Sequence, residues 1–238
     1  MKAQSGGNFK AVKLPKPSTT IGRCYSLIDI GHIPDTMSKE PGKTVHKIII
    51  TWELPEHKAV FNDEKGPEPF VVSEELTLST NEKSNLAKLI SAWRNKPFTA
   101  EEQKAFDPTV MVGKTGLIQF AIKTKAAYRG KEISEITNEN SVLTFAGIMK
   151  RPESMEAPAA INPKFVWDWE PIVSGEKQFD PEVFDKIPKF IQAKIMTSEE
   201  YIRFGPRESQ SEGQAAPATP AAPAQAPASN APVAGDDW

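Results

Sequence analysis

The sequence predicts a mainly β fold of the α+β class, in which one helical segment separates two groups of strands. Residues 45–54 are the clearest strand, because apolar and polar side chains alternate along them. The period changes at 81–95, where the apolar residues Leu86, Leu89, Ile90 and Trp93 follow helical spacing. Strand-like segments resume at 109. These three observations together predict a β structure with an inserted helix.

The first group holds three predicted strands. Residues 23–30 are rich in β-compatible side chains, and a loop dense in glycine and proline follows at 31–44. In the second strand, 45–54, one face carries Ile48, Ile50, Trp52 and Leu54, and the other carries Lys47, Thr51 and Glu53. The third strand is 70–79. Because Trp52 shares its face with three aliphatic residues, we expect it in the core.

The helical segment follows the third strand. Thr80 and Asn81 are the candidate N-caps of a helix over 81–95, which Pro97 ends. Thr99 and Glu102 form the capping-box pattern of a second, short helix. We expect Trp93 and Phe106 to pack against the strands from these helices.

The second group of predicted strands is 109–124, 133–137 and 141–149, with a charged hairpin loop at 125–132. Gly113 and Gly116 indicate a bulge or tight turn in the first of them. Three strands, a helix and two or three further strands are the layout of a five-stranded OB-fold barrel, which we assign to residues 21–151. The same order also fits a generic α+β sandwich.

Two further regions flank this domain. Residues 1–20 contain four lysines and no acid, which predicts a flexible basic arm. Residues 152–207 are interpreted as a C-terminal extension that packs on the barrel, with Phe165, Trp167 and Trp169 as candidate anchors. Within it, Pro188 interrupts a helical stretch over 180–195, and another helix begins at Thr197 or Ser198.

The end of the chain, 208–238, is predicted to be a disordered linker with an acidic tip. Of the 22 residues 214–235, 10 are alanine, 5 are proline and none is charged, so this stretch has little to bury. The tip is Asp236, Asp237 and Trp238. Two interpretations stay open: a solubilising tail, or a partner-binding tip that offers an indole and a carboxylate cluster to a basic, hydrophobic pocket.

Charge is distributed unevenly along the chain, whose net charge is −2. Residues 1–151 carry 22 lysines and arginines against 17 acids, whereas 208–238 carry four acids and no base. A basic N-terminal part with an acidic end is typical of a polyanion site and a mimic of the polyanion in one chain. Cys24 is the only cysteine, and His32, His46 and His57 form no ligand pattern, so we expect no metal and no cofactor.

The tail architecture resembles that of the single-stranded-DNA-binding proteins of bacteria and phages. The runs WELP (52–55), FVVS (70–73), NEKSNLAKLISAWRNKPFT (81–99) and NPKFVWD (162–168) resemble a family of uncharacterised phage proteins encoded among replication and recombination genes. The resemblance implies an OB-fold that binds single-stranded DNA, and a tip that recruits replication or recombination proteins and competes with DNA. It implies no catalytic residue.

The candidate DNA-binding residues form two groups. Lys123, Lys125, Arg129 and Lys131 surround Tyr128 in a projecting hairpin, with Gln119 on the same strand face as Lys123. Cations along such a hairpin can follow a phosphate backbone while tyrosine stacks on a base, although most such hairpin tips are only solvated. The second group is Arg23, Tyr25 and Lys47, which alternation places on strand faces that can border one groove.

The sequence offers little for catalysis. Asp29, Glu53, Glu74, Glu75 and Glu135 are scattered, and no P-loop, GxSxG, GxGxxG or HExxH motif is present, so we do not expect an enzyme. With no apolar run of about 18 residues and no signal-type N-terminus, the sequence predicts a cytoplasmic protein, in the host cytoplasm if viral. The alternatives are a phage adaptor that binds only protein and a nuclease with a cryptic acidic site. Homo-oligomerisation stays open.

Overall fold

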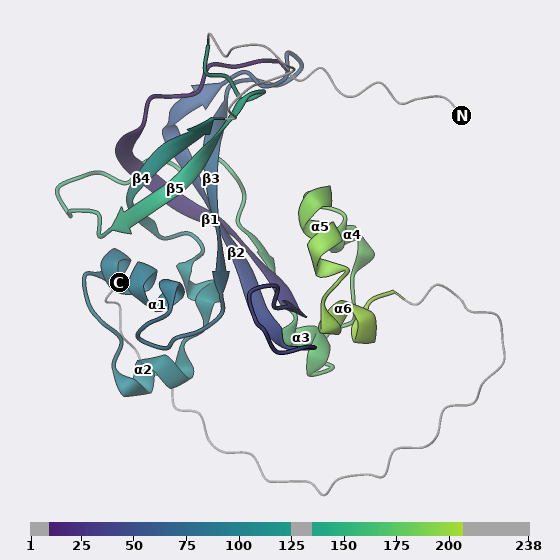
Figure 1. Cartoon of the computed structure of the whole chain (residues 1–238). Helices are drawn as coiled ribbons and strands as arrows, with labels where there is room; N and C mark the ends of the chain where they lie inside the picture. The colour runs from purple at the N-terminus through teal and green to yellow at the C-terminus, as the bar shows by residue number, and fades with distance from the viewer. Residues whose placement is uncertain (1–9, 125–134, 207–238) are drawn as a thin grey trace, which may run out of the picture. The chain divides into compact units, whose positions relative to one another are not determined.

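The computed structural model of the chain describes residues 10–124 and 135–206, which form one sheet and several short helices (Figure 1). The sheet has six strands in the order β3-β2-β1-β4-β5, and β6 pairs with β1 off this path. The pairs along the path are antiparallel, and β6 runs parallel to β1. The predicted mainly β class is therefore confirmed. The sheet does not close into the expected barrel, because no ladder joins β3 to β5 within the described ranges.

The central strand β1 (Ser18–Pro34) holds the sheet together. Its first part pairs with β4 (Thr115–Thr124), and its second part pairs with β2 (Thr44–Ala59) and with β6 (Phe165–Trp167). Two bulges interrupt its register with β2, at Tyr25 and at Ile30. The outer strands of the path are β3 (Glu68–Thr77) and β5 (Ser141–Met149), which approach each other with Cα atoms within 8 Å.

The inserted helical segment lies between β3 and β4, as predicted. Helix α1 (Asn85–Arg94) begins later than the expected 81, because the side chain of Ser84 caps it by accepting from the Ala87 amide. Helix α2 (Ala100–Ala105) has the predicted capping box of Thr99 and Glu102. The expected strand from 109 is wrong for its first residues: Pro108–Met111 form a 3-10 turn capped by Asp107, and β4 begins only at Thr115.

The core between α1 and the sheet is aromatic. Trp52 of β2 is fully buried, stacks on Phe145 at 4.8 Å between ring centroids, and lies 6.0 Å from Trp93 of α1. Both tryptophans are therefore core residues, as the alternation and the helical spacing predicted. Phe106, expected to be buried, is only partly so and packs edge-on against Phe98.

The C-terminal part of the described chain covers another area of the sheet (Figure 1). After β6 come four short helices: α3 (Glu170–Val173), α4 (Pro181–Phe184), α5 (Lys189–Ile195) and α6 (Glu199–Phe204). The break between α4 and α5 falls at Pro188, as predicted, and Ser198 caps α6. None of the helices in the described ranges combines the length and apolarity needed to cross a membrane.

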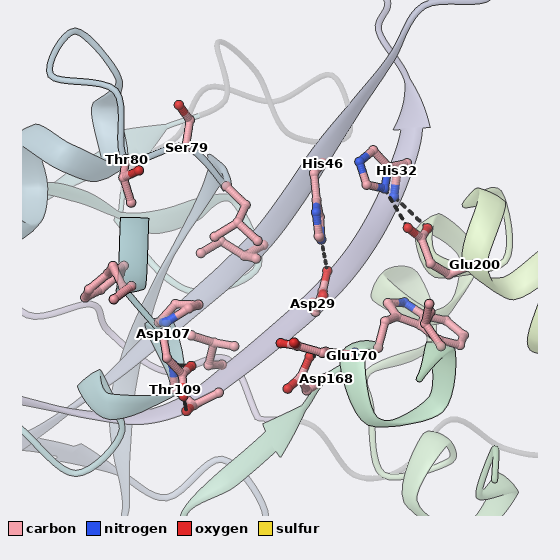
Figure 2. A pocket seen from close by; sticks show the side chains of 18 of the residues that line it. Asp29, His32, His46, Ser79, Thr80, Asp107, Thr109, Asp168, Glu170 and Glu200 are labelled. Atoms are coloured by element: carbon pink, nitrogen blue, oxygen red, sulfur yellow. Dashed lines mark hydrogen bonds and ion pairs between the residues drawn. The ribbon is translucent and has the colours of Figure 1, made fainter. Parts of the chain in front are cut away.

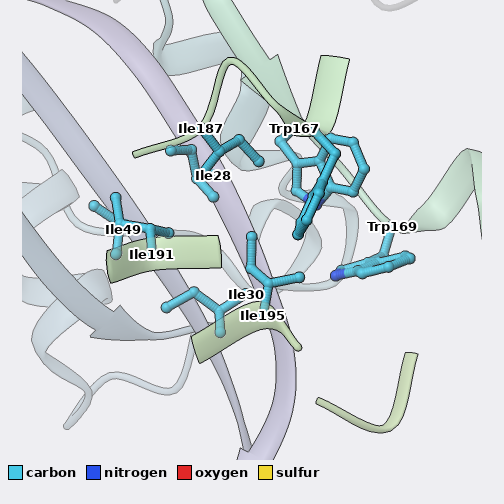
Figure 3. Close-up of a cluster of buried hydrophobic side chains, with 9 residues drawn as sticks. Ile28, Ile30, Ile49, Trp167, Trp169, Ile187, Ile191 and Ile195 are labelled. Carbon is cyan, nitrogen blue, oxygen red and sulfur yellow. The ribbon is translucent and has the colours of Figure 1, made fainter. Parts of the chain in front are cut away.

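A second hydrophobic cluster attaches these helices to the sheet (Figure 3). Ile28, Ile30 and Ile49 supply the sheet side, and two of the three predicted anchors, Trp167 and Trp169, are buried against them. Phe165, the third, is partly buried at the edge of the cluster. The extension therefore packs on the sheet through its aromatic residues. The other members, from α4, α5 and the link between them, are Phe184, Ile187, Ile191 and Ile195.

Candidate nucleic-acid interface

The open side of the sheet holds an apolar groove. A cavity of about 440 Å³ is lined by residues of both outer strands, β3 and β5, together with side chains from β1 and the flanking loops. Two valines at this opening, Val71 and Val142, are 41% and 55% exposed. A largely apolar cavity of this size is large enough to hold a ligand. The other lining residues are Leu14, Tyr25, Phe61, Glu68, Pro69, Phe70, Asn138, Ser141, Leu143 and Asn162.

Aromatic rings form part of the groove wall. Tyr25 is the extra residue of the first β1 bulge, and its side chain is half-buried at the cavity. Bulges commonly redirect a side chain in this way. Phe61 and Phe70 pack edge to face with centroids 5.1 Å apart. Burial, followed by the charge of Glu53 and the nearby Cys24, raises the pKa of the Tyr25 hydroxyl, so the ring stays neutral and can stack on a base.

The polar rim of the groove is built by the segment before β5. The side-chain Oδ1 of Asn138 accepts a hydrogen bond from the Val12 backbone amide at 2.9 Å. The backbone amide of Asn138 donates to the Val12 carbonyl at 3.0 Å. Lys13 also forms an isolated bridge with Thr137. The arm expected to be flexible over 1–20 is therefore tied to this rim at 12–14, and its residues 18–20 belong to β1.

A second cavity extends the groove toward the end of β4. It has a volume of about 410 Å³ and shares Asn138, Ser141 and Val142 with the first. Lys123, Thr124 and Glu139 complete its lining. Lys123 is exposed near the end of β4, opposite Val142 of β5. Tyr25 thus borders the first cavity and Lys123 borders the second, adjoining one.

The charge around the groove is mixed. Lys10 forms an ion pair with Asp63, and Lys13 lies 3.7 Å from Glu135. Glu68 and Glu139 line the two cavities, beside Lys123. The described part of the groove is therefore apolar and nearly balanced in charge, and the cations that the sequence places at 125–131 lie outside the described residues.

The predicted site residues fall in different places. Arg23 is 5% exposed and forms an ion pair with Glu53 at 2.7 Å, so its guanidinium lies inside the protein and not on the surface of the groove. Lys47 pairs with Thr77 at the far end of β3, six positions or about 20 Å along the strand from Val71. Gln119 is exposed on β4, the strand of Lys123. Lys125, Tyr128, Arg129, Lys131, Asp236, Asp237 and Trp238 lie outside the described residues.

Several residues of the groove were not indicated by any pattern in the sequence. Phe61, Asn138 and Asn162 lie in loops with no periodic pattern, and Phe70 belongs to a strand whose partner across the opening was not predictable. The run FVVS was expected to begin the third strand and carries part of the resemblance, but neither indicated that it lines a groove. Its first two residues, Phe70 and Val71, both line the cavity.

A larger cavity, of about 850 Å³, lies elsewhere and is lined by acids (Figure 2). Asp29, Asp107, Asp168, Glu170 and Glu200 border it, against one lysine, Lys104. Two histidines, His32 and His46, also line this predominantly acidic cavity. Within the described ranges, no group of three or more His, Cys, Asp or Glu side chains is placed to hold a metal ion.

Comparisons with known proteins do not add to this geometry. No protein-family model, no curated protein and no solved structure matches the chain.

Proposed function

We propose that the chain binds single-stranded DNA without sequence preference, on an open OB-fold-like sheet. The order β3-β2-β1-β4-β5, with the helical insertion between β3 and β4, supports the OB-fold interpretation. So does the close approach of β3 and β5, the two strands whose pairing would close the barrel. The open seam between β3 and β5 is the point at which the path of five strands fails to close.

The observation that carries the proposal is the groove at that seam. Tyr25 and Phe61, both partly buried, offer aromatic surface beside exposed valines, with the buried Phe70 packed against Phe61. Lys123 borders the adjoining cavity. The hairpin that follows Lys123 adds three cations and Tyr128 in sequence. Aromatic stacking combined with backbone-tracking cations suits unpaired bases, whose faces are free, whereas duplex bases are stacked inside the helix.

The C-terminal tip has a separate role in this proposal. Asp236, Asp237 and Trp238 recruit replication or recombination proteins, and the acidic tip competes with DNA for the cationic hairpin. The opposite charges of the two regions support this idea, since 208–238 carry four acids and no base. The proteins recruited would themselves present a basic, apolar pocket.

The direct test is a fluorescence-anisotropy titration of labelled oligo-dT of about 30 nucleotides and of a matched duplex, at about 50 and about 200 mM salt. We expect tight binding to the single strand, weakened by salt, and much weaker binding to the duplex. Absence of single-strand binding at the lower salt concentration would overturn the proposal. Equal affinity for duplex would replace it with a non-specific electrostatic interaction.

A second function is favoured by one observation, the mixed charge of the groove. Two neighbouring strand edges, exposed valines and balanced charge also suit an extended peptide that adds to a sheet edge. In that case the protein is an adaptor without DNA affinity. Peptide binding that is insensitive to salt, together with no anisotropy change on oligo-dT, would distinguish this function from the first.

A further inference from the structure

Two histidine–carboxylate pairs meet where β1, β2 and α6 come together (Figure 2). His32 of β1 and His46 of β2 are direct cross-strand partners, with ring centroids 4.4 Å apart. His46 Nε2 lies 2.7 Å from Asp29 Oδ1, and His32 Nδ1 lies 2.6 Å from Glu200 Oε1. His32 therefore joins the α6 side chain of Glu200 to the sheet, whereas His46 pairs with Asp29 inside the sheet and lies against the His32 ring.

The end of β1 is shaped to receive the Glu200 carboxylate. The backbone amide of His32 donates to Glu200 Oε2 at 2.7 Å, so both carboxylate oxygens are bound by the same residue. The preceding Gly31 has φ of +87°, and a Cβ at this position would collide with Glu200 Oε2. Glycine is therefore required here for two reasons, the backbone conformation and the space for the carboxylate.

Helix α6 has few other attachments. It spans only Glu199–Phe204, and none of its residues is fully buried. Tyr201 and Phe204 pack, partly buried, on the edge of the second hydrophobic cluster. Isolated helices of this length are not stable in water, so its position depends on these few contacts and on Glu200. The sequence beyond it leads, from Pro206, into the C-terminal segment.

We propose that Asp29, His32, His46 and Glu200 form a pH-sensitive latch that fastens α6 to the sheet in mildly acidic solution and loosens it as the pH rises. The latch is distinct from the groove and does not depend on DNA binding. Its consequence is that the stability of the last helix before the tail is set by proton concentration.

The direction of the effect follows from the groups around the imidazoles. Burial acts to lower the pKa of His46, but the hydrogen bond and charge of Asp29, with the charges of Glu200 and Asp168, outweigh it and raise the pKa above 6.5. The stabilisation by charged His46 is therefore complete below pH 6.5 and is lost as the pH rises through the raised value. Glu170, Asp107 and Lys104 line the same cavity, and acids predominate among them.

The carboxylate sets the lower limit of the window. Burial acts to raise the pKa of Glu200, but the hydrogen bonds from the His32 ring and amide outweigh it and lower the pKa below 4.5. Its stabilisation is therefore present above pH 4.5 and is lost as the pH falls through the lowered value. Between these limits Glu200 is charged and His46 is protonated, so the attraction between them, and with it the latch, is strongest there.

The expected change is moderate in size. A neutral imidazole can still donate from the nitrogen that faces its carboxylate, so the hydrogen bonds persist and only the charge assistance is lost. We therefore expect α6 to open several times more readily at high pH, while the sheet and α1 keep their protection.

The test is amide hydrogen exchange of the full-length protein at about pH 5.5 and about pH 8.5, corrected for intrinsic exchange rates. Protection of α6 relative to α1 should fall severalfold between the two values in the wild type. In Glu200→Gln, which preserves the shape of the side chain, α6 should be less protected at the lower pH and the difference between the two values should shrink. The double variant His32→Gln/His46→Gln should show no difference.

A matched control and a second disruption complete the experiment. His57, which packs on Phe120 with centroids 5.5 Å apart, is outside the latch, and His57→Gln should keep the wild-type difference. Gly31→Ala should displace the carboxylate and expose α6 at both pH values. If the amide protection of α6 relative to α1 were the same at both pH values in the wild type, the latch would be overturned. A pH-dependent difference in protection that persists in the double histidine variant would overturn it as well.

Discussion

Arg23 and Glu53 form a buried ion pair at the centre of the sheet, with Arg23 Nε 2.7 Å from Glu53 Oε1 and side chains only 6% and 0% exposed. Glu53 also accepts the backbone amides of Ile161 and Asn162, at 3.1 and 2.7 Å. Arg23 in turn donates to the Asn162 carbonyl at 2.5 Å. The pair therefore joins β1, β2 and the segment that leads into β6.

Removing one partner of this pair should destabilise the whole fold. Arg23→Ala leaves the Glu53 carboxylate buried without its cation, which typically costs about 3–5 kcal/mol. We expect a large decrease in the free energy of unfolding, measured by urea denaturation, whereas Gln119→Ala, exposed on β4, should change it little. If Arg23→Ala keeps its unfolding midpoint but loses DNA affinity, Arg23 is a direct DNA contact after all.

The location of Arg23 shows what alternation can and cannot predict. Alternation placed Arg23 and Tyr25 on one strand face, but the bulge at Tyr25 breaks the period between them. It also gives no information about which faces are covered. Cys24, Arg23 and Ser26 are all buried, because segments remote in sequence pack on both sides of β1. Trp52 was predictable because its strand has a regular apolar face.

Local signals predicted several helix boundaries correctly but missed the start of α1, which Ser84 caps instead of the expected Thr80 or Asn81. Thr99 with Glu102, Pro188 and Ser198 mark helix boundaries by hydrogen bonding and ring geometry within a few residues, and the structure has those boundaries. The His32–Glu200 contact joins residues 168 positions apart, so no pattern in the sequence indicates it. The seam between β3 and β5 is equally non-local, so the sequence could not show that these two strands fail to pair.

Two glycines face each other across β1 and β4, and each should resist substitution. Gly22 and Gly116 are Cα partners, and a Cβ on Gly116 would lie 2.7 Å from Trp93 Nε1 and 2.9 Å from Ile148 Cδ1. Gly116→Ala should therefore destabilise the fold by about 1–3 kcal/mol through overpacking. Thermal unfolding measures this cost. Gly66→Ala, which meets nothing within 4 Å, is the control and should be nearly neutral.

Tyr25 should contribute to DNA affinity through its ring. Tyr25→Ala removes the aromatic surface at the groove and should weaken oligo-dT binding by about 1–3 kcal/mol, or about 5- to 150-fold in Kd. Tyr25→Phe keeps the ring and should bind nearly as well as the wild type. Urea unfolding of both variants separates this loss from instability. Equal affinity of the alanine variant and the wild type would exclude Tyr25 from the interface.

The hairpin cations should determine the salt dependence of binding. Changing Lys123, Lys125, Arg129 and Lys131 together to alanine removes at most four phosphate contacts, so the slope of log K against log salt should flatten by about 3 at most. A matched variant removes four lysines that line neither cavity of the groove and are exposed, Lys83, Lys88, Lys177 and Lys186. It changes the net charge equally and should keep the slope. If the slope of log K against log salt were the same in the two variants, the hairpin would have no specific role in DNA binding.

Deleting 213–238 should tighten DNA binding, and most clearly at low salt. The deletion removes the carboxylates of Asp236 and Asp237, which compete with phosphate for the same cations in the proposed mechanism. Anisotropy titration with oligo-dT at several salt concentrations measures the change. The full-length variant Asp236→Asn/Asp237→Asn keeps the linker and Trp238, and should reproduce most of the gain if charge is the cause. Affinity that the deletion leaves unchanged at every salt concentration would remove the competition, and the tip would then act only in recruiting partners.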